Sequence, residues 1–179
     1  MAEINHSEVI FFSFTSSLSV SDIQAQVIHP ERVVGMHFFN PAPVMKLVEV
    51  VKGNQTTDAV AATIMQLCKQ MNKVPVLCKD APGFIVNRVA RHYYLEAMKL
   101  VEQGVATIET VDEVMEASGF KMGPFKLMDL IGMDVNLAVS QSMYKAFGDA
   151  ERFKPSPLQI EKVAKGELGK KTGKGFYEY

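Results

Sequence analysis

The stretch VVGMHFFNPAPVMKLVEVVKG, residues 33–53, contains the pattern from which the predicted fold follows. Two apolar runs, 33–39 and 46–53, flank the proline-rich link at 40–43. Valine and phenylalanine favour strands, whereas proline and asparagine favour turns, so we predict two neighbouring strands with a short connection. His37 lies near the end of the first run, and Glu49 lies in the second. Two such strands would bring the imidazole and the carboxylate within hydrogen-bonding distance.

Similar elements lie on both sides of this stretch. Residues 9–14 form another β-prone run, and a Thr-Ser-Ser cluster separates it from a helical segment at 19–27. From Thr57 onward apolar residues recur at helical spacing, and residues 74–79 again have a strand pattern. The alternation of strands and helices predicts an α/β sheet for residues 1–80.

After residues 80–83 (DAPG) the pattern changes to helices alone. We predict a long helix over 86–101, further helices over 110–117 and 134–147, and another that starts at Ser156-Pro157. The predicted apolar face of the long helix comprises Val86, Val89, Ala90, Tyr93, Ala97, Leu100 and Val101. No strand is expected between residues 84 and 172, so residues 81–179 form an all-α domain in this prediction.

The α/β part is small. Three or so strands with no partner for the first edge make a marginal sheet, which suggests a truncated domain or strands supplied by another polypeptide. The residues thus predict an incomplete α/β domain followed by an all-α helical domain.

Composition excludes several classes of protein. The chain has 19 Lys and Arg against 20 Asp and Glu, so neither a basic field for nucleic acid nor an acidic tail is present. No apolar run approaches the ~20 residues that a bilayer requires. The first residues are too polar for a signal peptide, and Cys68 and Cys78 have no metal-ligand spacing. We expect two buried, reduced thiols, a cytoplasmic location and no membrane or nucleic-acid partner.

His37 and Glu49 are the candidates for acid–base chemistry. A carboxylate on one ring nitrogen orients a histidine and raises its basicity, as a general base requires. Spacing by itself nevertheless favours a purely structural pair, and a metal site would need further ligands nearby. The segment 166–176 (GELGKKTGKGF) fails the Walker phosphate-loop pattern, and we interpret it as a basic, flexible tail anchored by Phe176, Tyr177 and Tyr179.

Five segments share motifs with a known family: TSSL (15–18), GMHFFNPAPVMKLVEVV (35–51), KDAPGFIVNRV (79–89), GPFKLMDLIGMDVN (123–136), and ERFKPSPL with GELGKKTGKGFYEY (151–179). They resemble the 3-hydroxyacyl-CoA dehydrogenases, including the bacterial 3-hydroxybutyryl-CoA enzymes. The resemblance implies an NAD-binding Rossmann-type domain, of which residues 1–80 are the last part, and a helical dimerisation domain at 81–179. It also implies an acyl-CoA substrate, a homodimer, and a phosphate-binding G-x-G-x-x-G turn that this sequence lacks. A separate NAD-binding half is therefore a possible partner.

The same resemblance assigns roles to individual residues. His37 looks like the catalytic base and Glu49 like its orienting carboxylate. Ser16 and Asn87 resemble the polar pair that holds the substrate oxygens. In the implied reaction, His37 removes the proton of the 3-hydroxyl while hydride passes to NAD; reduction of the 3-oxo compound uses the same groups in reverse.

Three residues of the chain resemble positions that approach the cofactor: Asn40, Lys171 and, again, Ser16. One position departs from the family, which usually has asparagine where this chain has Phe14. An aromatic side chain there changes the surroundings expected for the nicotinamide.

Two hypotheses follow. The first is an NAD-dependent dehydrogenase represented by a fragment or by one part of a split enzyme. The second is a dimerising, acyl-CoA-binding remnant without turnover. Since the phosphate cradle is missing, we expect weak or no NAD binding by this chain alone.

Overall fold

The computed structural model describes residues 5–6, 8–16 and 18–179, so Ser17 of the TSSL motif lies outside the described residues. The chain divides into two compact units, Met1–Ile85 and Val86–Tyr179, which are described separately below.

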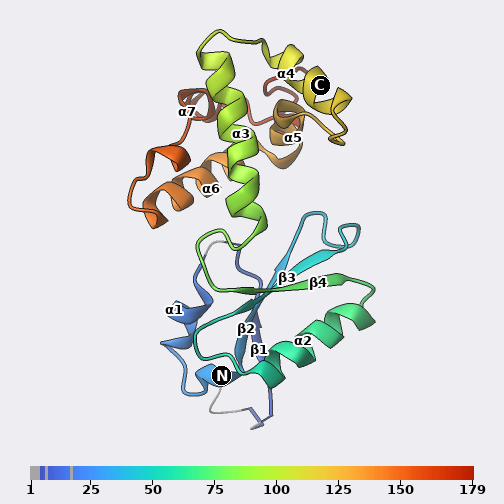
Figure 1. Cartoon of the computed structure of the whole chain (residues 1–179), viewed down its shortest axis with the longest axis vertical. Helices are drawn as coiled ribbons and strands as arrows, with labels where there is room; N and C mark the ends of the chain where they lie inside the picture. Colours follow the sequence, from blue (N-terminus) through green and yellow to red (C-terminus); the bar gives the residue numbers. More distant parts are fainter. Residues whose placement is uncertain (1–4, 7, 17) are drawn as a thin grey trace. The chain divides into compact units, whose positions relative to one another are not determined.

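The first unit is built on a four-stranded sheet with the order β1-β2-β3-β4 (Figure 1). The strands are β1 (Phe11–Ser13), β2 (Val33–Phe38), β3 (Leu47–Lys52) and β4 (Val74–Lys79). The pairs β1–β2 and β3–β4 are parallel, and β2–β3 is antiparallel. The predicted strands within 33–53 are confirmed. However, the strand count is four, and no helix separates β2 from β3, so the alternation of strands and helices is interrupted there.

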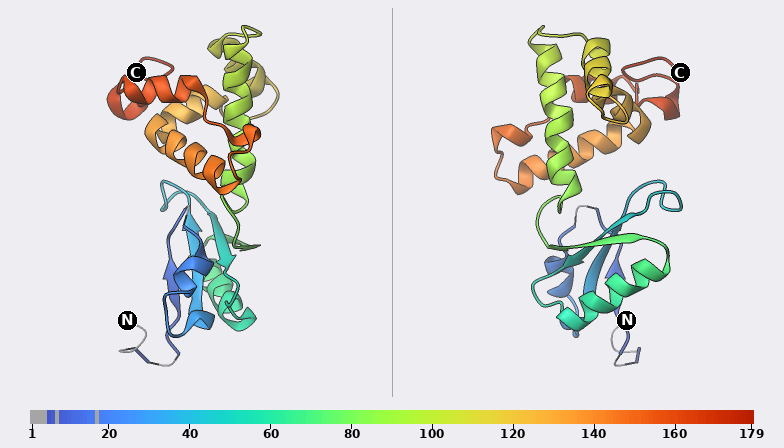
Figure 2. Two further views of the ribbon diagram at one scale, coloured as in Figure 1. Left: turned by 90° about the vertical axis from the view of Figure 1, so that its left-hand side faces the viewer. Right: turned by 45° about the vertical axis from the view of Figure 1, so that its right-hand side comes forward.

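Two helices cover opposite faces of this sheet (Figures 1 and 2). On one face α2 (Asp58–Gln70) packs Ile64 and Cys68 against Val34, Met36, Val48 and Val50. On the other face α1 (Val20–Gln24) brings Val20 onto Val33, Val51 and Phe84. Because alternate strand residues point to opposite faces, His37 and Glu49 share the α1 face with Val33 and Val51. A short 3₁₀ segment, Pro30–Arg32, precedes β2.

Gly35 allows α1 to approach β2 closely. A Cβ atom at this position would lie 2.8 Å from Val51 Cβ and 2.9 Å from Val20 Cγ2. Any side chain there would push α1 away from the sheet.

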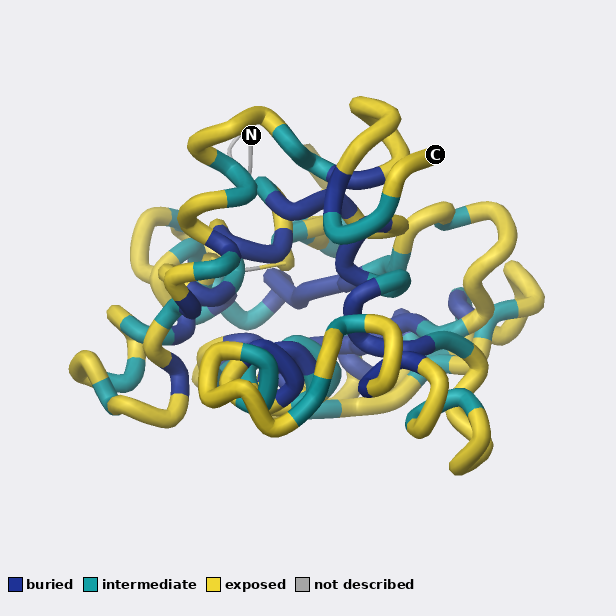
Figure 3. Tube along the Cα trace, turned by 90° about the horizontal axis from the view of Figure 1, so that it is seen from above, coloured by how far each residue is buried: buried dark blue, intermediate teal, exposed yellow. Residues whose placement is uncertain are grey.

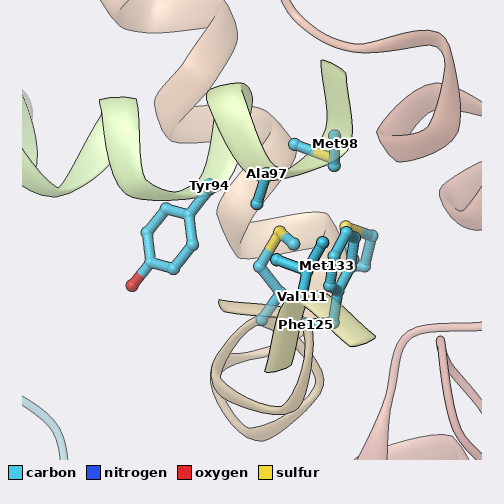
Figure 4. Packing of buried hydrophobic residues seen from close by; sticks show 7 residues of the cluster. Tyr94, Ala97, Met98, Val111, Phe125 and Met133 are labelled. Atoms are coloured by element: carbon cyan, nitrogen blue, oxygen red, sulfur yellow. The ribbon is translucent and has the colours of Figure 1, made fainter. Parts of the chain in front are cut away.

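The second unit consists of five α-helices: α3 (Val86–Glu102), α4 (Ile108–Ala117), α5 (Pro124–Ile131), α6 (Met133–Ala146) and α7 (Pro157–Ala164). Short 3₁₀ segments cover Glu151–Phe153 and Lys170–Thr172. The core, in Figure 4, joins Tyr94, Ala97, Met98, Val111, Phe125, Met128 and Met133. No strand lies between residues 84 and 172, all of which are described, so this expectation is confirmed.

The predicted apolar face of the long helix is wrong in part. Val89 is 68% exposed, whereas the buried residues of α3 are Arg91, Tyr94, Ala97 and Met98. The helix contacts α5 and α6, and its buried face differs from the predicted one. Because this face includes the charged Arg91, it could not be recognised from the spacing of apolar residues.

Figure 3 shows how buried segments alternate with exposed ones along the chain.

Two smaller expectations are also corrected. Cys78 is only half-buried because β4 is the outermost strand, although Cys68 is buried as expected. The C-terminal segment is anchored by aromatic residues but forms a hydrogen-bonded loop, with bridges from Gly169 to Lys174 and from Lys174 to Glu178. Within the described ranges, no helix is long and apolar enough to cross a membrane.

Candidate active site

His37 and Glu49 form a buried hydrogen-bonded pair. They lie directly opposite each other in the antiparallel register of β2 and β3. Nδ1 of His37 is 2.7 Å from Oε2 of Glu49, and the two residues are only 5% and 1% exposed. The sheet itself therefore creates the contact, because facing residues of neighbouring strands are its closest side-chain pairs.

The pair fixes the protonation pattern of the imidazole. A carboxylate can only accept hydrogen bonds, so Nδ1 of His37 donates to Glu49. In the neutral ring, Nε2 then carries the lone pair and is the nitrogen that can take a proton from a substrate. This is the arrangement of a general base with an orienting carboxylate.

The second carboxylate oxygen of Glu49 is also used. Oε1 accepts the backbone N–H of Ile85 at 2.9 Å. Just before Ile85, Phe84 has a positive φ of 46°, a conformation that costs a non-glycine residue about 1–3 kcal/mol. The rings of Phe39 and Phe84 lie 4.6 and 5.6 Å from the imidazole of His37. Strained backbone and two aromatic rings thus surround the pair, as is common at active sites.

Ser16 is exposed in the loop between β1 and α1. The far end of this loop is tied to the sheet by Asp80, whose Oδ2 accepts both the hydroxyl of Ser19 and the backbone N–H of Ser21 at 2.8 Å. Phe14, at the start of the loop, is 63% exposed and contacts the rings of Phe12 and Phe38. The aromatic residue thus extends an exposed aromatic cluster at the β1 end of the sheet.

Asn40 is exposed just after β2, in the link to β3. Lys73 organises this link, since its ammonium group donates to the carbonyl oxygens of Ala42 at 2.6 Å and Met45 at 2.9 Å. No sequence pattern pointed to Lys73, because it reaches the link from the loop after α2.

The other two predicted site residues belong to the second unit. Asn87 is half-buried in the first turn of α3. Lys171 lies in the Lys170–Thr172 segment, and its Nζ is 2.5 Å from Oδ1 of Asp134 at the start of α6. The hydrogen bond from Lys171 lowers the pKa of Asp134, so the lysine is held in place by an ionised partner.

Asp129 holds the loop that carries Lys171. It is 1% exposed and accepts the backbone N–H groups of Phe176 and Tyr177 at 2.9 Å and the hydroxyl of Tyr179 at 3.1 Å. A Cβ atom on Gly175 would lie 2.1 Å from its Oδ1. The available sequence signal was a lone acidic residue inside the apolar run PFKLMDLI, since buried carboxylates are normally hydrogen-bonded.

The described residues contain little that would hold the pyrophosphate of a dinucleotide. Such groups bind to a glycine-rich turn between a strand and a helix N-terminus. Of the three strand-to-helix turns in the described part of the chain, β1–α1 has no glycine and β4–α3 has a single one, Gly83. In the third, β3–α2, Gln24 fills the space beside Gly53, where a Cβ atom would lie 2.3 Å from its Oε1. No group of three or more metal-ligating side chains occurs in the described part of the chain. Ser16, Asn40 and Lys171 have polar side chains of the kind that contact a cofactor. They do not replace the glycine-rich turn that would hold its pyrophosphate.

Comparison with known proteins identifies the family. Residues 1–81 match the NAD-binding domain of 3-hydroxyacyl-CoA dehydrogenases, and residues 83–179 match their C-terminal domain. The chain belongs to the 3-hydroxyacyl-CoA dehydrogenase family. The resemblance found in the sequence motifs is thereby confirmed.

Relatives within the 3-hydroxyacyl-CoA dehydrogenase family are longer than this chain. A 3-hydroxyadipyl-CoA dehydrogenase of Escherichia coli K12 is 49% identical over the whole chain, which covers 38% of that protein. The mouse mitochondrial hydroxyacyl-coenzyme A dehydrogenase is 43% identical over 95% of the chain and 54% of its own length. A crystal structure of 3-hydroxybutyryl-CoA dehydrogenase from E. coli K12 aligns with a TM-score of 0.96 at 49% identity, over 99% of this chain and 38% of that one. The chain thus spans between about a third and about half of these relatives.

Proposed function

We propose that the chain supplies the acid–base half of an NAD-dependent 3-hydroxyacyl-CoA dehydrogenase. The reaction is oxidation of a 3-hydroxyacyl-CoA to the 3-oxoacyl-CoA, or its reverse. The observation that supports this most directly is the buried His37–Glu49 pair, with Nδ1 committed to the carboxylate.

In this mechanism Nε2 of His37 takes the proton of the substrate 3-hydroxyl. Glu49 stabilises the imidazolium that forms, because its charge lies 2.7 Å from Nδ1. In the reverse direction the same nitrogen returns the proton to the 3-oxo oxygen. NAD, when bound, supplies the acceptor for the hydride that leaves carbon 3.

Ser16 and Asn87 are the proposed ligands of the substrate oxygens. Both have polar side chains. Ser16 lies in the loop after β1, and Asn87 lies in the first turn of α3. Ser16, Asn40 and Lys171 are the residues proposed to approach the cofactor. Asp134 and Asp129 support this role for Lys171, because they fix the side chain and its loop.

We expect the chain alone to bind NAD weakly. Without a glycine-rich cradle among the described residues, the affinity should fall by several kcal/mol, on the order of a thousandfold.

A homodimer formed through residues 81–179 is also part of the proposal. It is supported by exposed apolar side chains on the second unit: Val89, Val105, Val114, Leu130 and Val135. The chain's own cytoplasmic location remains a prediction.

The test is an assay of acetoacetyl-CoA reduction with millimolar NADH. His37→Gln should abolish turnover. His29→Gln is a matched control, because His29 also pairs with a glutamate, Glu31, but the two side chains are exposed. Measurable turnover by the wild type that His37→Gln retains in full would refute the proposed role of His37. If the wild type binds acyl-CoA by calorimetry but shows no turnover, the non-catalytic acyl-CoA-binding alternative is favoured instead.

A further inference from the structure

Arg91 is a buried cation in the middle of α3. The residue is only 3% exposed. Its hydrogen bonds all use Nη1, which lies 2.8 Å from the backbone oxygen of Asn136, 3.1 Å from Asn136 Oδ1 and 2.9 Å from Ser140 Oγ. Every partner is neutral, and within the described ranges no carboxylate forms an ion pair with this guanidinium.

A buried charge without a counter-ion is costly. Burial lowers the pKa of Arg91 to about 10, whereas the electrostatic influence of Tyr94 raises it. The ring of Tyr94 lies 5.1 Å from the guanidinium carbon. A purely structural link between α3 and α6 would not need a cation. A neutral side chain could donate hydrogen bonds to the same oxygen atoms of Asn136 and Ser140 with a smaller desolvation penalty.

The cluster around Arg91 contains buried hydrogen-bond donors that have no acceptor among the described residues. Nε2 of Gln159 donates to Asn136 Oδ1 at 2.5 Å and to Ser140 Oγ at 3.1 Å, so the oxygen acceptors are shared. Nε of Arg91 and Nδ2 of Asn136 are both buried and lack a partner in the part of the chain that the structure describes. Unsatisfied donors around a cation suit an anion, and the Nε edge of a guanidinium binds carboxylates in a bidentate manner.

The position of Arg91 along α3 suggests which anion. Asn87, the proposed ligand of the substrate 3-oxygen, lies four residues earlier, so both residues belong to one side of the helix and are separated by a rise of about 6 Å. In a six-carbon dicarboxylic acyl chain, the terminal carboxylate follows carbon 3 by three bonds of about 1.5 Å each. Hydrogen bonds of about 3 Å at the two ends of this chain, to Asn87 and to Arg91, cover the remaining distance.

We propose that the cluster of Arg91, Asn136, Ser140 and Gln159 binds the terminal carboxylate of a short dicarboxylic 3-hydroxyacyl-CoA, through the Nε edge of Arg91. This specificity rests on the proposed function, in particular on Asn87 as the ligand of the 3-oxygen. The existing Nη1 bonds stay in place, and the substrate supplies the missing negative charge.

The direct test compares two thioesters that differ only in the terminal group, 3-hydroxyadipyl-CoA and 3-hydroxyhexanoyl-CoA. Each is titrated into the wild-type chain, and ¹H–¹⁵N spectra follow the Arg91 Nε–H signal together with the backbone amides of Ser16, His37 and Asn87. We expect both ligands to shift the amides, but only the dicarboxylic one to shift the Arg91 Nε–H. Its affinity should be at least about tenfold higher, as expected for hydrogen bonds to a charged group.

Arg91→Met provides the second measurement, with Arg88→Met as the matched control. Arg88 lies on the same helix but is exposed, over the ring of Phe147. Arg91→Met should bring the two affinities within about threefold of each other, whereas Arg88→Met should leave their ratio unchanged.

The outcomes separate the two proposals. If both thioesters shift the amides equally and the Arg91 Nε–H does not move, the inference about Arg91 is wrong and the proposed function stands. If neither ligand shifts any of these signals, both are refuted. An equal loss of both affinities in Arg91→Met, with the ratio preserved, would show that the cluster is only structural.

Discussion

Replacing Glu49 with glutamine tests whether this carboxylate sets the tautomer of His37. The amide has nearly the same shape, but it offers one acceptor and one donor in place of two acceptors. The backbone N–H of Ile85 can only donate, so the amide oxygen must face Ile85. The amide nitrogen then faces His37 Nδ1, which has to become an acceptor. The ring proton is therefore forced onto Nε2, the nitrogen that should receive the substrate proton.

The structure predicts very different sizes for the effects on stability and on catalysis. The hydrogen bonds of Glu49 to His37 and Ile85 survive in neutral form, so the free energy of unfolding should fall by about 1–3 kcal/mol, the difference between two charged and two neutral hydrogen bonds. Turnover should fall by on the order of 10⁴-fold, the effect known when the carboxylate behind a catalytic histidine of a serine protease becomes an amide. A purely structural pair would show the first effect without the second.

Long-range ¹H–¹⁵N spectra of the imidazole nitrogens report which nitrogen carries the proton. We expect the Nδ1–H tautomer of His37 in the wild type and the Nε2–H tautomer in Glu49→Gln. Glu31→Gln is the control, because the exposed His29–Glu31 pair should affect neither the tautomer of His37 nor the stability. The same His37 tautomer in wild type and Glu49→Gln would refute this argument.

Three further predictions concern other parts of the chain. Asp129→Asn should lower the free energy of unfolding by about 2–4 kcal/mol, because the amide keeps only one of the two oxygens that accept hydrogen bonds from three donors. Urea titrations followed by circular dichroism measure this change, and an unchanged midpoint would contradict the anchoring role of Asp129. Lys162 and Lys174 lower the pKa of Glu167 to about 2, so its stabilisation is complete above its unfolded pKa of about 4.3 and is lost as the pH falls toward 2. Glu167→Gln should therefore lose less stability than the wild type between pH 5 and pH 2, and an identical loss would exclude this contribution. Phe14→Asn should change the unfolding free energy by less than about 1 kcal/mol, since the side chain is 63% exposed, and a larger change in the same titration would show that the aromatic cluster is a stabilising element.

Most of the local structure could be predicted from the sequence. The strands at 33–38 and 47–52, the helical second half and the family motifs all followed from residues close to one another in the chain. Periodicity and turn residues act over a few positions, so they can be recognised without the fold. Even the His37–Glu49 contact was accessible, because two strands with a short link have few ways to pair.

The partners that come from distant segments depend on how the elements pack. Three hydrogen-bonded contacts join residues 28 to 50 positions apart in the chain: Ile85 with Glu49, Lys73 with the link after β2, and Asp129 with residues 176–179. No short-range pattern records such contacts. Arg91 shows the limit most clearly: by spacing it is an ordinary charged residue on a helix, and only the packing of α3 against α6 and α7 buries it without a counter-ion. Burial is a property of the assembled helices, and it is burial that turns a common side chain into a candidate binding site.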